Sequence, residues 1–143
     1  MRTLVALLLA AAAAISAELD PAILRFQIPA NIQWTGTDPV KRFTLYGDPT
    51  KPGLYAVLIK WPPGSGTRPH THPNDRFVTV LSGTWWVGTG KEYDMSKTVP
   101  MPAGTFITHT AGGIHFDGAK DEEVILQVVG MGPGTTNYLD APK

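Results

Sequence analysis

The chain has 143 residues, which predicts one domain at roughly 100–200 residues per domain. Its 12 Lys and Arg balance its 12 Asp and Glu, and this neutrality argues against the basic surface of a nucleic-acid-binding domain. Hydrophobic residues make up 43% of the chain, which is enough for a core. The 15 glycines and 13 prolines favour short strands joined by turns over long helices.

The first 17 residues are predicted to be a secretory signal peptide. Arg2 supplies a positive charge, an apolar run of twelve residues extends from Leu4 to Ile15, and small residues follow at Ser16 and Ala17, which is the layout of a signal peptide. Cleavage after Ser16 or after Ala17 fits equally well. The run is shorter than the ~20 residues of a spanning helix. We therefore expect an exported protein, periplasmic or secreted, that leaves the membrane once the signal is removed. The absence of cysteine excludes disulfides and thiolate ligands.

The remainder is expected to divide into an N-terminal arm at 18–40, a β-barrel at 41–135 and a C-terminal tail at 136–143. In the barrel segment, runs of four to eight residues rich in Val, Ile, Thr and aromatic side chains alternate with turns, as strands do. Ser82 and Gly83 between two runs predict a compact hairpin. Evenly spaced short strands predict an all-β sandwich or barrel. The expected strands are residues 42–46, 54–61, 77–81, 84–87, 105–108 and 124–129.

All four histidines lie between residues 70 and 115. His70 and His72 are two apart, so on a strand both side chains point to one face and can reach one metal ion. His115 follows a turn with two glycines, which can direct it toward the other two. Three neutral imidazoles with open coordination positions suit Zn²⁺ and also Fe, Mn, Ni or Cu. His109 is interpreted either as a residue behind these ligands or as an exposed strand residue.

The spacing of the first two histidines resembles the first sequence motif of the cupin family. That motif is Gly, five residues, His-x-His, three or four residues, Glu, six residues, Gly. Here Gly64 is followed after five residues by the pair His70 and His72, and Arg76 and Gly83 occupy the remaining two places.

The second cupin motif is Gly, five residues, Pro-x-Gly, two residues, His, three residues, Asn. Gly104, Gly112 and His115 stand at the matching places, with Thr110 for the proline and Ala119 for the asparagine. The resemblance covers residues 54–129 and implies a single-domain cupin jelly-roll β-barrel. It also implies a homodimer in which edge strands pair between subunits.

The resemblance implies a metal site that departs from the family's pattern at one ligand. His70, His72 and His115 stand in ligand positions, but Arg76 stands in the place of the glutamate, or Phe77 if the other spacing applies. Neither side chain can bind a cation. We therefore expect one divalent metal ion, Zn, Fe or Mn, held by three histidines with more open positions than the four-ligand pattern leaves.

Arg76 shares strand parity with His70 and His72 and is expected to point into the same pocket. A guanidinium beside a divalent cation is unfavourable unless an anion lies between them. One hypothesis is therefore that Arg76 orients an anionic group of a small-molecule ligand. The alternative is that Arg76 pairs with Asp75, Asp117 or another carboxylate and has no role in binding.

Two classes of function fit these residues. The first is a metal-dependent enzyme that acts on a small molecule by Lewis-acid or oxygen chemistry, with Arg76 orienting the substrate and His109 behind the ligands. The alternative is a non-enzymatic periplasmic module that binds or senses a small molecule with a weakened metal site. Its pocket would be lined by Trp85, Trp86, Tyr93, Phe106 and Phe116. The sequence has no Gly-x-Ser-x-Gly elbow and no phosphate-binding loop.

Overall fold

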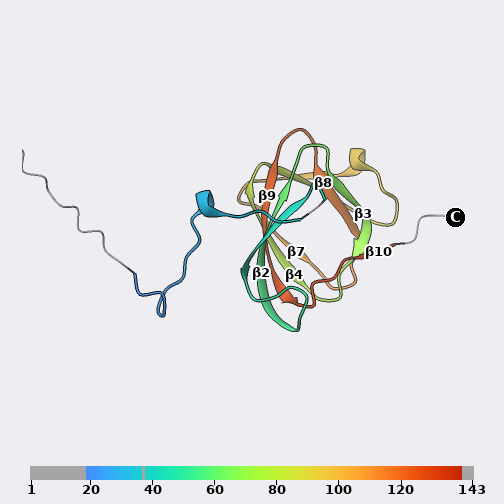
Figure 1. Cartoon of the computed structure of the whole chain (residues 1–143). Coiled ribbons are helices and arrows are strands. Elements are labelled where there is room, and N and C mark those ends of the chain that lie inside the picture. The colour runs from blue at the N-terminus through green and yellow to red at the C-terminus, as the bar shows by residue number, and fades with distance from the viewer. Residues whose placement is uncertain (1–18, 37, 140–143) are drawn as a thin grey trace, which may run out of the picture.

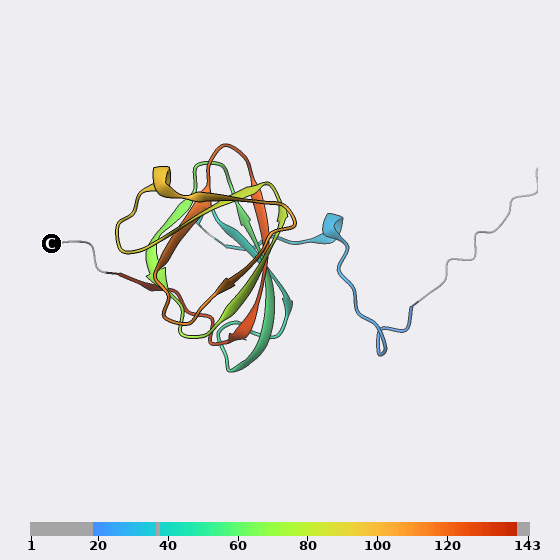
Figure 2. The ribbon, with the colours of Figure 1, turned by 180° about the vertical axis from the view of Figure 1, so that it is seen from behind.

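The computed structural model describes residues 19–36 and 38–139, so the predicted signal peptide at 1–17 lies outside the described residues. Ten strands form two five-stranded sheets, which curve around a common interior (Figures 1 and 2). The strands are β1 (Lys41–Tyr46), β2 (Gly53–Trp61), β3 (Gly66–Thr71), β4 (Arg76–Ser82), β5 (Thr84–Thr89), β6 (Val99–Pro102), β7 (Phe106–His109), β8 (His115–Ala119), β9 (Val124–Gly132) and β10 (Asn137–Tyr138). Two short 3-10 helices, η1 (Pro29–Asn31) and η2 (Met95–Lys97), complete the described elements.

The strand order places segments that are distant in sequence side by side. The first sheet has the order β1-β2-β9-β4-β7 and the second has the order β10-β3-β8-β5-β6. Neighbouring strands are antiparallel throughout. The longest pairing joins β2 to β9, from Gly53 opposite Gly132 to Trp61 opposite Val124. This is the two-sheet arrangement of a jelly roll. In the described part of the chain, no helix is long and apolar enough to span a membrane.

The core lies between the two sheets and follows from the alternation of side chains along the strands. On β9, alternate residues are buried, while those between them are half-buried or exposed. The same alternation on β4 turns its valines inward, and the second sheet contributes a tryptophan and an alanine. The side chains of this core that are 2% exposed or less include Val78, Val80, Trp85, Ala119, Val124, Leu126 and Val128.

The hairpin between β4 and β5 confirms the prediction made from Ser82 and Gly83. Gly83 has a φ of +73°, a conformation that side chains with a Cβ rarely adopt. A Cβ at this position would also collide with the carbonyl oxygen of Glu123. The turn therefore requires glycine on two independent grounds.

Each of the six predicted strands is present, and the structure adds four more. The strand β3 contains the His70 position, while β6, β8 and β10 are found where no strand was expected. The short β10 lies within the segment expected as a tail and pairs with β3, placing Tyr138 opposite His70. The C-terminal segment thus borders the strand that carries the first histidine.

The N-terminal arm touches the barrel only near its end, among the residues described. Thr35 forms a bridge with Arg42 of β1, and the Lys60 Nζ atom lies 4.6 Å from the centre of the Trp34 ring. The preceding residues project away from the barrel in both views (Figures 1 and 2).

Candidate metal centre

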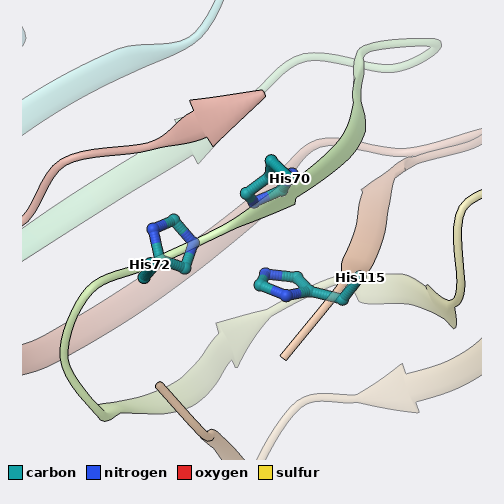
Figure 3. A group of neighbouring side chains, drawn as sticks. All are labelled: His70, His72 and His115. Carbon is teal, nitrogen blue, oxygen red and sulfur yellow. The ribbon is translucent and has the colours of Figure 1, made fainter. Parts of the chain in front are cut away.

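Two neighbouring strands bring the three predicted ligands together. The strands β3 and β8 are antiparallel partners, and His70 lies directly opposite His115. His72 follows the end of β3 and keeps the parity of His70, so all three rings converge from one side of the second sheet (Figure 3). The ligand nitrogens of the three histidines all lie within 4.8 Å of one another. The geometry therefore joins the three residues that the sequence singled out.

Backbone carbonyls orient each of the three rings. The Nδ1 atom lies 2.7 Å from the Arg68 carbonyl in His70, 2.8 Å from the Thr135 carbonyl in His72, and 3.0 Å from the Gly113 carbonyl in His115. A carbonyl only accepts, so Nδ1 carries the proton and donates, and Nε2 keeps its lone pair. This is the outer hydrogen bond that metal-ligating histidines typically make.

Burial keeps two of these imidazoles neutral at physiological pH. Desolvation, followed by the positive charge of Arg76, lowers the pKa of His72 to about 3. Desolvation also lowers the pKa of His115 to about 4. The Nε2 atoms of both residues are buried without a hydrogen-bond partner, an arrangement that requires an explanation in a native core. A divalent cation between the rings would satisfy these lone pairs, so the residues fit the metal that the pattern implies.

Arg76 begins β4 and faces the same interior, as its parity predicted. Its guanidinium is largely buried, its Nε atom has no hydrogen-bond partner, and burial lowers its pKa. Tyr55 and the charge of Asp117 act in the opposite direction and raise this pKa. Across the described residues, no carboxylate lies within ion-pair distance of this guanidinium. Neither Asp75 nor Asp117 therefore forms the ion pair that was considered as the alternative.

Asp75 forms a hydrogen bond with the backbone instead. Its Oδ1 atom accepts a hydrogen bond of 2.7 Å from the backbone N–H of Ala111. This bond links the start of β4 to the turn that precedes His115.

His109 lies beside the cluster at the end of β7 and is 6% exposed. Its ring centre is 3.9 Å from that of His115, and its Nδ1 atom lies 3.5 Å from Nη2 of Arg76. Because a guanidinium can only donate, His109 accepts through Nδ1 and carries its proton on Nε2. Desolvation, with the charges of the neighbouring histidines and Arg76, lowers its pKa to about 2. His109 is thus neutral, with the opposite tautomer to the three converging rings.

Asp117 is a buried group that the sequence named only as a partner for Arg76. It lies two residues after His115 on β8 and therefore points to the same side. Its carboxylate accepts a hydrogen bond from the Thr67 hydroxyl, and burial raises its pKa. The His115 Nε2 atom is 3.8 Å from its Oδ2 atom; because the imidazole is neutral, this contact is not an ion pair. The sequence did contain an indication that Asp117 belongs to the site, since the spacing from His115 to Asp117 repeats that from His70 to His72.

A second set of potential ligands overlaps the first at His115. The ligand atoms of His109, His115 and Asp117 also lie within 4.8 Å of one another. However, the lone pair of His109 lies on Nδ1 and already accepts from Arg76, whereas each histidine of the first set keeps a free lone pair on Nε2. The set formed by His70, His72 and His115 is therefore the better metal site.

His70 and His72 line a pocket of about 320 Å³, while His115 lies behind them and is not among its lining residues. Its polar end contains His70, His72, Arg76 and Asp117, with Tyr55 and Thr67 beside them. Its apolar wall is formed by Val57, Ile59, Trp61, Trp85, Leu126 and Val128. The pocket can therefore hold a small molecule with one polar end and one apolar end.

Of the aromatic residues considered as pocket lining, only Trp85 lines this pocket. Trp86 lies under the Lys120 amine, 3.5 Å from it. Phe106 is 64% exposed, and Phe116 packs edge-on against Tyr93. The expectation that Trp86, Tyr93, Phe106 and Phe116 line the pocket was therefore wrong, while Trp85 does line it.

Comparisons with known proteins show which fold this chain has. No family model and no curated protein matches the chain. Solved structures do match, among them an RmlC-like cupin from Shewanella frigidimarina with a TM-score of 0.60 and 15% identity, covering 76% of this chain and 92% of that one. The chain has the cupin fold. This confirms the all-β, cupin-like architecture that the two motifs predicted.

Two enzymes are also among the similar cupin structures. The polyketide cyclase RemF from Streptomyces resistomycificus has a TM-score of 0.67 and 15% identity, covering 84% of this chain and 88% of that one. The DMSP lyase DddQ from Ruegeria pomeroyi has a TM-score of 0.61 and 18% identity, covering 76% of this chain and 61% of that one. At such identities the likeness concerns the fold.

Proposed function

We propose that this cupin is a metal-dependent enzyme that acts on a small molecule, with His70, His72 and His115 holding one divalent ion of Zn, Fe or Mn. The observation that carries the proposal is the convergence of three Nε2 lone pairs whose Nδ1 protons are held by carbonyls. Three protein ligands leave open positions for substrate or water, as catalytic metal sites require. When bound, the metal would supply Lewis-acid polarisation or oxygen chemistry.

Arg76 is proposed to orient an anionic group of the substrate. A buried cation without a carboxylate in ion-pair distance is costly, and an anion in the pocket would offset that cost. Arg76 and Tyr55 both line the pocket, so a bound anion can reach the guanidinium. The substrate anion would then occupy the space between Arg76 and the three histidines, the placement that electrostatics favours.

His109 is proposed to act behind the ligands. Because Arg76 fixes its proton on Nε2, this ring presents an N–H to the interior beside His115. The buried Nε2–H has no acceptor among the described residues, so it is free to donate to a group bound at the site. Asp117 and Thr67 provide a second polar pair near His115.

The comparisons support an enzyme without selecting the reaction. The similar structures include a lyase and a cyclase, so the fold accommodates different chemistries, and fold alone does not determine function.

The second candidate is a non-enzymatic periplasmic module that binds or senses a small molecule. The observation that favours it is Arg76 in the place of a metal-ligating glutamate. A nearby cation weakens the binding of a divalent ion by Coulomb repulsion. A pocket whose metal affinity had been lost would still retain its polar end and its apolar wall.

The deciding experiment is elemental analysis of the protein purified without chelator or added metal. The enzyme proposal expects about one equivalent of a single metal per chain, as three-histidine sites bind, and none in the His70→Ala/His72→Ala double variant. Thr71→Ala is the matched control, since Thr71 lies between the two ligands and points the other way; it should retain the metal. Mixed, sub-stoichiometric metal that the double variant leaves unchanged, with no uptake on reconstitution, would favour the binding module.

A further inference from the structure

Asp117 is a second buried charge in the pocket that Arg76 lines, and the proposed function does not say what it binds. The residue is only 2% exposed, yet it lies among the residues that line the pocket, as Arg76 does. A carboxylate taken out of water is stable only when hydrogen-bond donors or positive charges surround its oxygens. The contacts of its two oxygen atoms therefore show what a bound ligand would have to supply.

Only one of these oxygens has a donor within the described part of the chain. Oδ1 accepts a hydrogen bond from the Thr67 hydroxyl, whereas Oδ2 accepts none. The basic nitrogen closest to Oδ2 is Nε2 of His115, at 3.8 Å, which is too long for a hydrogen bond. This nitrogen also carries a lone pair instead of a proton, because Nδ1 of the same ring donates to the Gly113 carbonyl. Oδ2 therefore keeps its full capacity to accept a hydrogen bond.

Asp117 and Arg76 do not neutralise each other. Arg76 begins β4 in the first sheet, and Asp117 lies on β8 in the second, so the two side chains reach the pocket from different sheets. No ion pair joins them among the residues that the structure describes. A ligand in the pocket would thus meet a positively charged donor from one sheet and a negatively charged acceptor from the other.

We propose that the pocket binds a small hydroxy acid whose carboxylate faces Arg76 and whose hydroxyl donates a hydrogen bond to Oδ2 of Asp117. The proposal rests on the anion-orienting role of Arg76 in the proposed function and adds a residue that selects the substrate. An acid without the hydroxyl would cover Oδ2 and leave this oxygen unpaired, and a site built around a hydroxyl discriminates strongly against analogues that lack it. Asp117 is thus the specificity-determining residue of the pocket.

A hydroxyl suits this position better than an ammonium group, although both can donate. The same end of the pocket contains the Arg76 guanidinium and is proposed to hold a divalent ion, so positive charge there outweighs the single negative charge of Asp117. A further cation would be repelled at such short range, whereas a hydroxyl donates without adding charge. The apolar wall, which includes Ile59, Trp61 and Leu126, then accommodates an aryl or alkyl remainder of the acid.

The test compares mandelate with phenylacetate, two carboxylates with an apolar ring that differ only in one hydroxyl. Isothermal titration calorimetry of the Zn²⁺-loaded protein measures both affinities. We expect mandelate to bind roughly 10- to 100-fold more tightly, which is the ratio that a hydrogen bond to a charged group provides. This preference should persist after chelation, because Arg76 and Asp117 belong to the chain. It should disappear in Asp117→Leu, which has a side chain of similar shape but no acceptor.

One variant and one ligand serve as controls. Asp121→Leu is the matched variant, since Asp121 is exposed in the connection between β8 and β9 and does not line the pocket; it should keep the preference for mandelate. The ligand is 2-methoxy-2-phenylacetate, whose ether oxygen can accept but cannot donate, and it should bind no better than phenylacetate. The ligand comparisons need only the wild-type protein, so they test the proposal even if circular dichroism shows that Asp117→Leu does not fold.

Equal affinities of the wild type for mandelate and phenylacetate would overturn the proposal. So would a preference that Asp117→Leu retains, one that Asp121→Leu also loses, or a methoxy compound that binds like mandelate. A preference lost on chelation would assign the hydroxyl to the metal, which would refute the role of Asp117 and leave the proposed function intact. Failure of both acids to bind the loaded protein would instead remove the anion-orienting role of Arg76, and this proposal with it.

Discussion

Arg76 sets the electrostatics of the site at the level of a single residue. It places a buried positive charge beside three imidazoles that would already share a divalent cation, and this charge lowers the pKa of His72. It also donates to Nδ1 of His109 and thereby occupies the lone pair through which that ring could bind a metal. One side chain thus separates the three rings that can ligate from the fourth that cannot, and leaves room for an anion.

The first prediction concerns anion binding by Arg76. Replacing Arg76 by Ala in the Zn²⁺-loaded protein should weaken binding of benzoate, a carboxylate with an apolar ring, by roughly 10- to 100-fold, because charged hydrogen bonds contribute about 1.5–3 kcal/mol. Isothermal titration calorimetry measures the affinity. Arg68→Ala is the control, since Arg68 is exposed and lies against Tyr138. Equal affinities for Arg76→Ala and wild type would remove the anion-orienting role.

The second prediction concerns the stability of the metal-free protein in acid. His72, His109 and His115 have folded pKa values of about 3, 2 and 4, below the unfolded value of about 6.5. The unfolded chain therefore takes up protons first, and the stability present above pH ~6.5 is lost as the pH falls toward the folded values. Asp117, with its raised pKa, works in the opposite direction.

The three histidine shifts predict a loss of about 4 kcal/mol per pH unit near pH 5, and Asp117 makes the net loss smaller. Urea unfolding of the chelated protein at several pH values measures it. The variant His109→Gln should reduce the slope by about one proton, or roughly 1.4 kcal/mol per unit. A free energy of unfolding that is constant between pH 6.5 and 4 would show that these histidines are not held neutral in the folded state.

At the scale of the elements, the hydrophobic pattern of the sequence was enough to predict strands that are rich in β-branched and aromatic residues, as β2 and β9 are. The hydrophobic pattern did not predict β8, because its sequence His-Phe-Asp-Gly-Ala contains no β-branched residue. It did not predict β6 either, because the two prolines of Val-Pro-Met-Pro are tolerated only in a strand at the edge of its sheet. The three histidines were identifiable because their spacing is local. Tyr55 and Thr67 were not, since only the pairing of distant strands brings them to the site.

The third prediction concerns the β4–β5 hairpin. Gly83→Ala should destabilise the protein by about 2–3 kcal/mol, because it combines a left-handed φ with a collision against the Glu123 carbonyl. Gly64→Ala is the matched control: its φ of +74° is nearly the same, but nothing lies within 4 Å of the added Cβ. It should cost only about 1 kcal/mol. If chemical denaturation showed the same loss of unfolding free energy for both variants, the turn would relax around the added Cβ, and the left-handed φ alone would determine the loss.

At the scale of the whole molecule, the ligand cluster joins segments from across the sequence. His70 and His115 lie on paired strands, and the His72 ring is held by the Thr135 carbonyl close to the C-terminal strand. An ion bound to all three would therefore link the second sheet to the segment that borders its edge. Since it would bind the folded chain only, it would add to the stability of the whole barrel.

The fourth prediction follows from this linkage. Removing the metal with a chelator should lower stability by about 3 kcal/mol if the free ion exceeds its Kd by ~100-fold, which corresponds to a fall in Tm of roughly 10–20 °C for a domain of this size. Differential scanning calorimetry of the loaded and chelated protein measures it. The His70→Ala/His72→Ala variant should melt at one temperature under both conditions, whereas Thr71→Ala should keep the full difference. If the wild type also melted at the same temperature with and without chelator, the histidine cluster would hold no metal. The buried Nε2 atoms of His72 and His115 would then need another partner, and a ligand bound in the pocket would be the one group able to reach them.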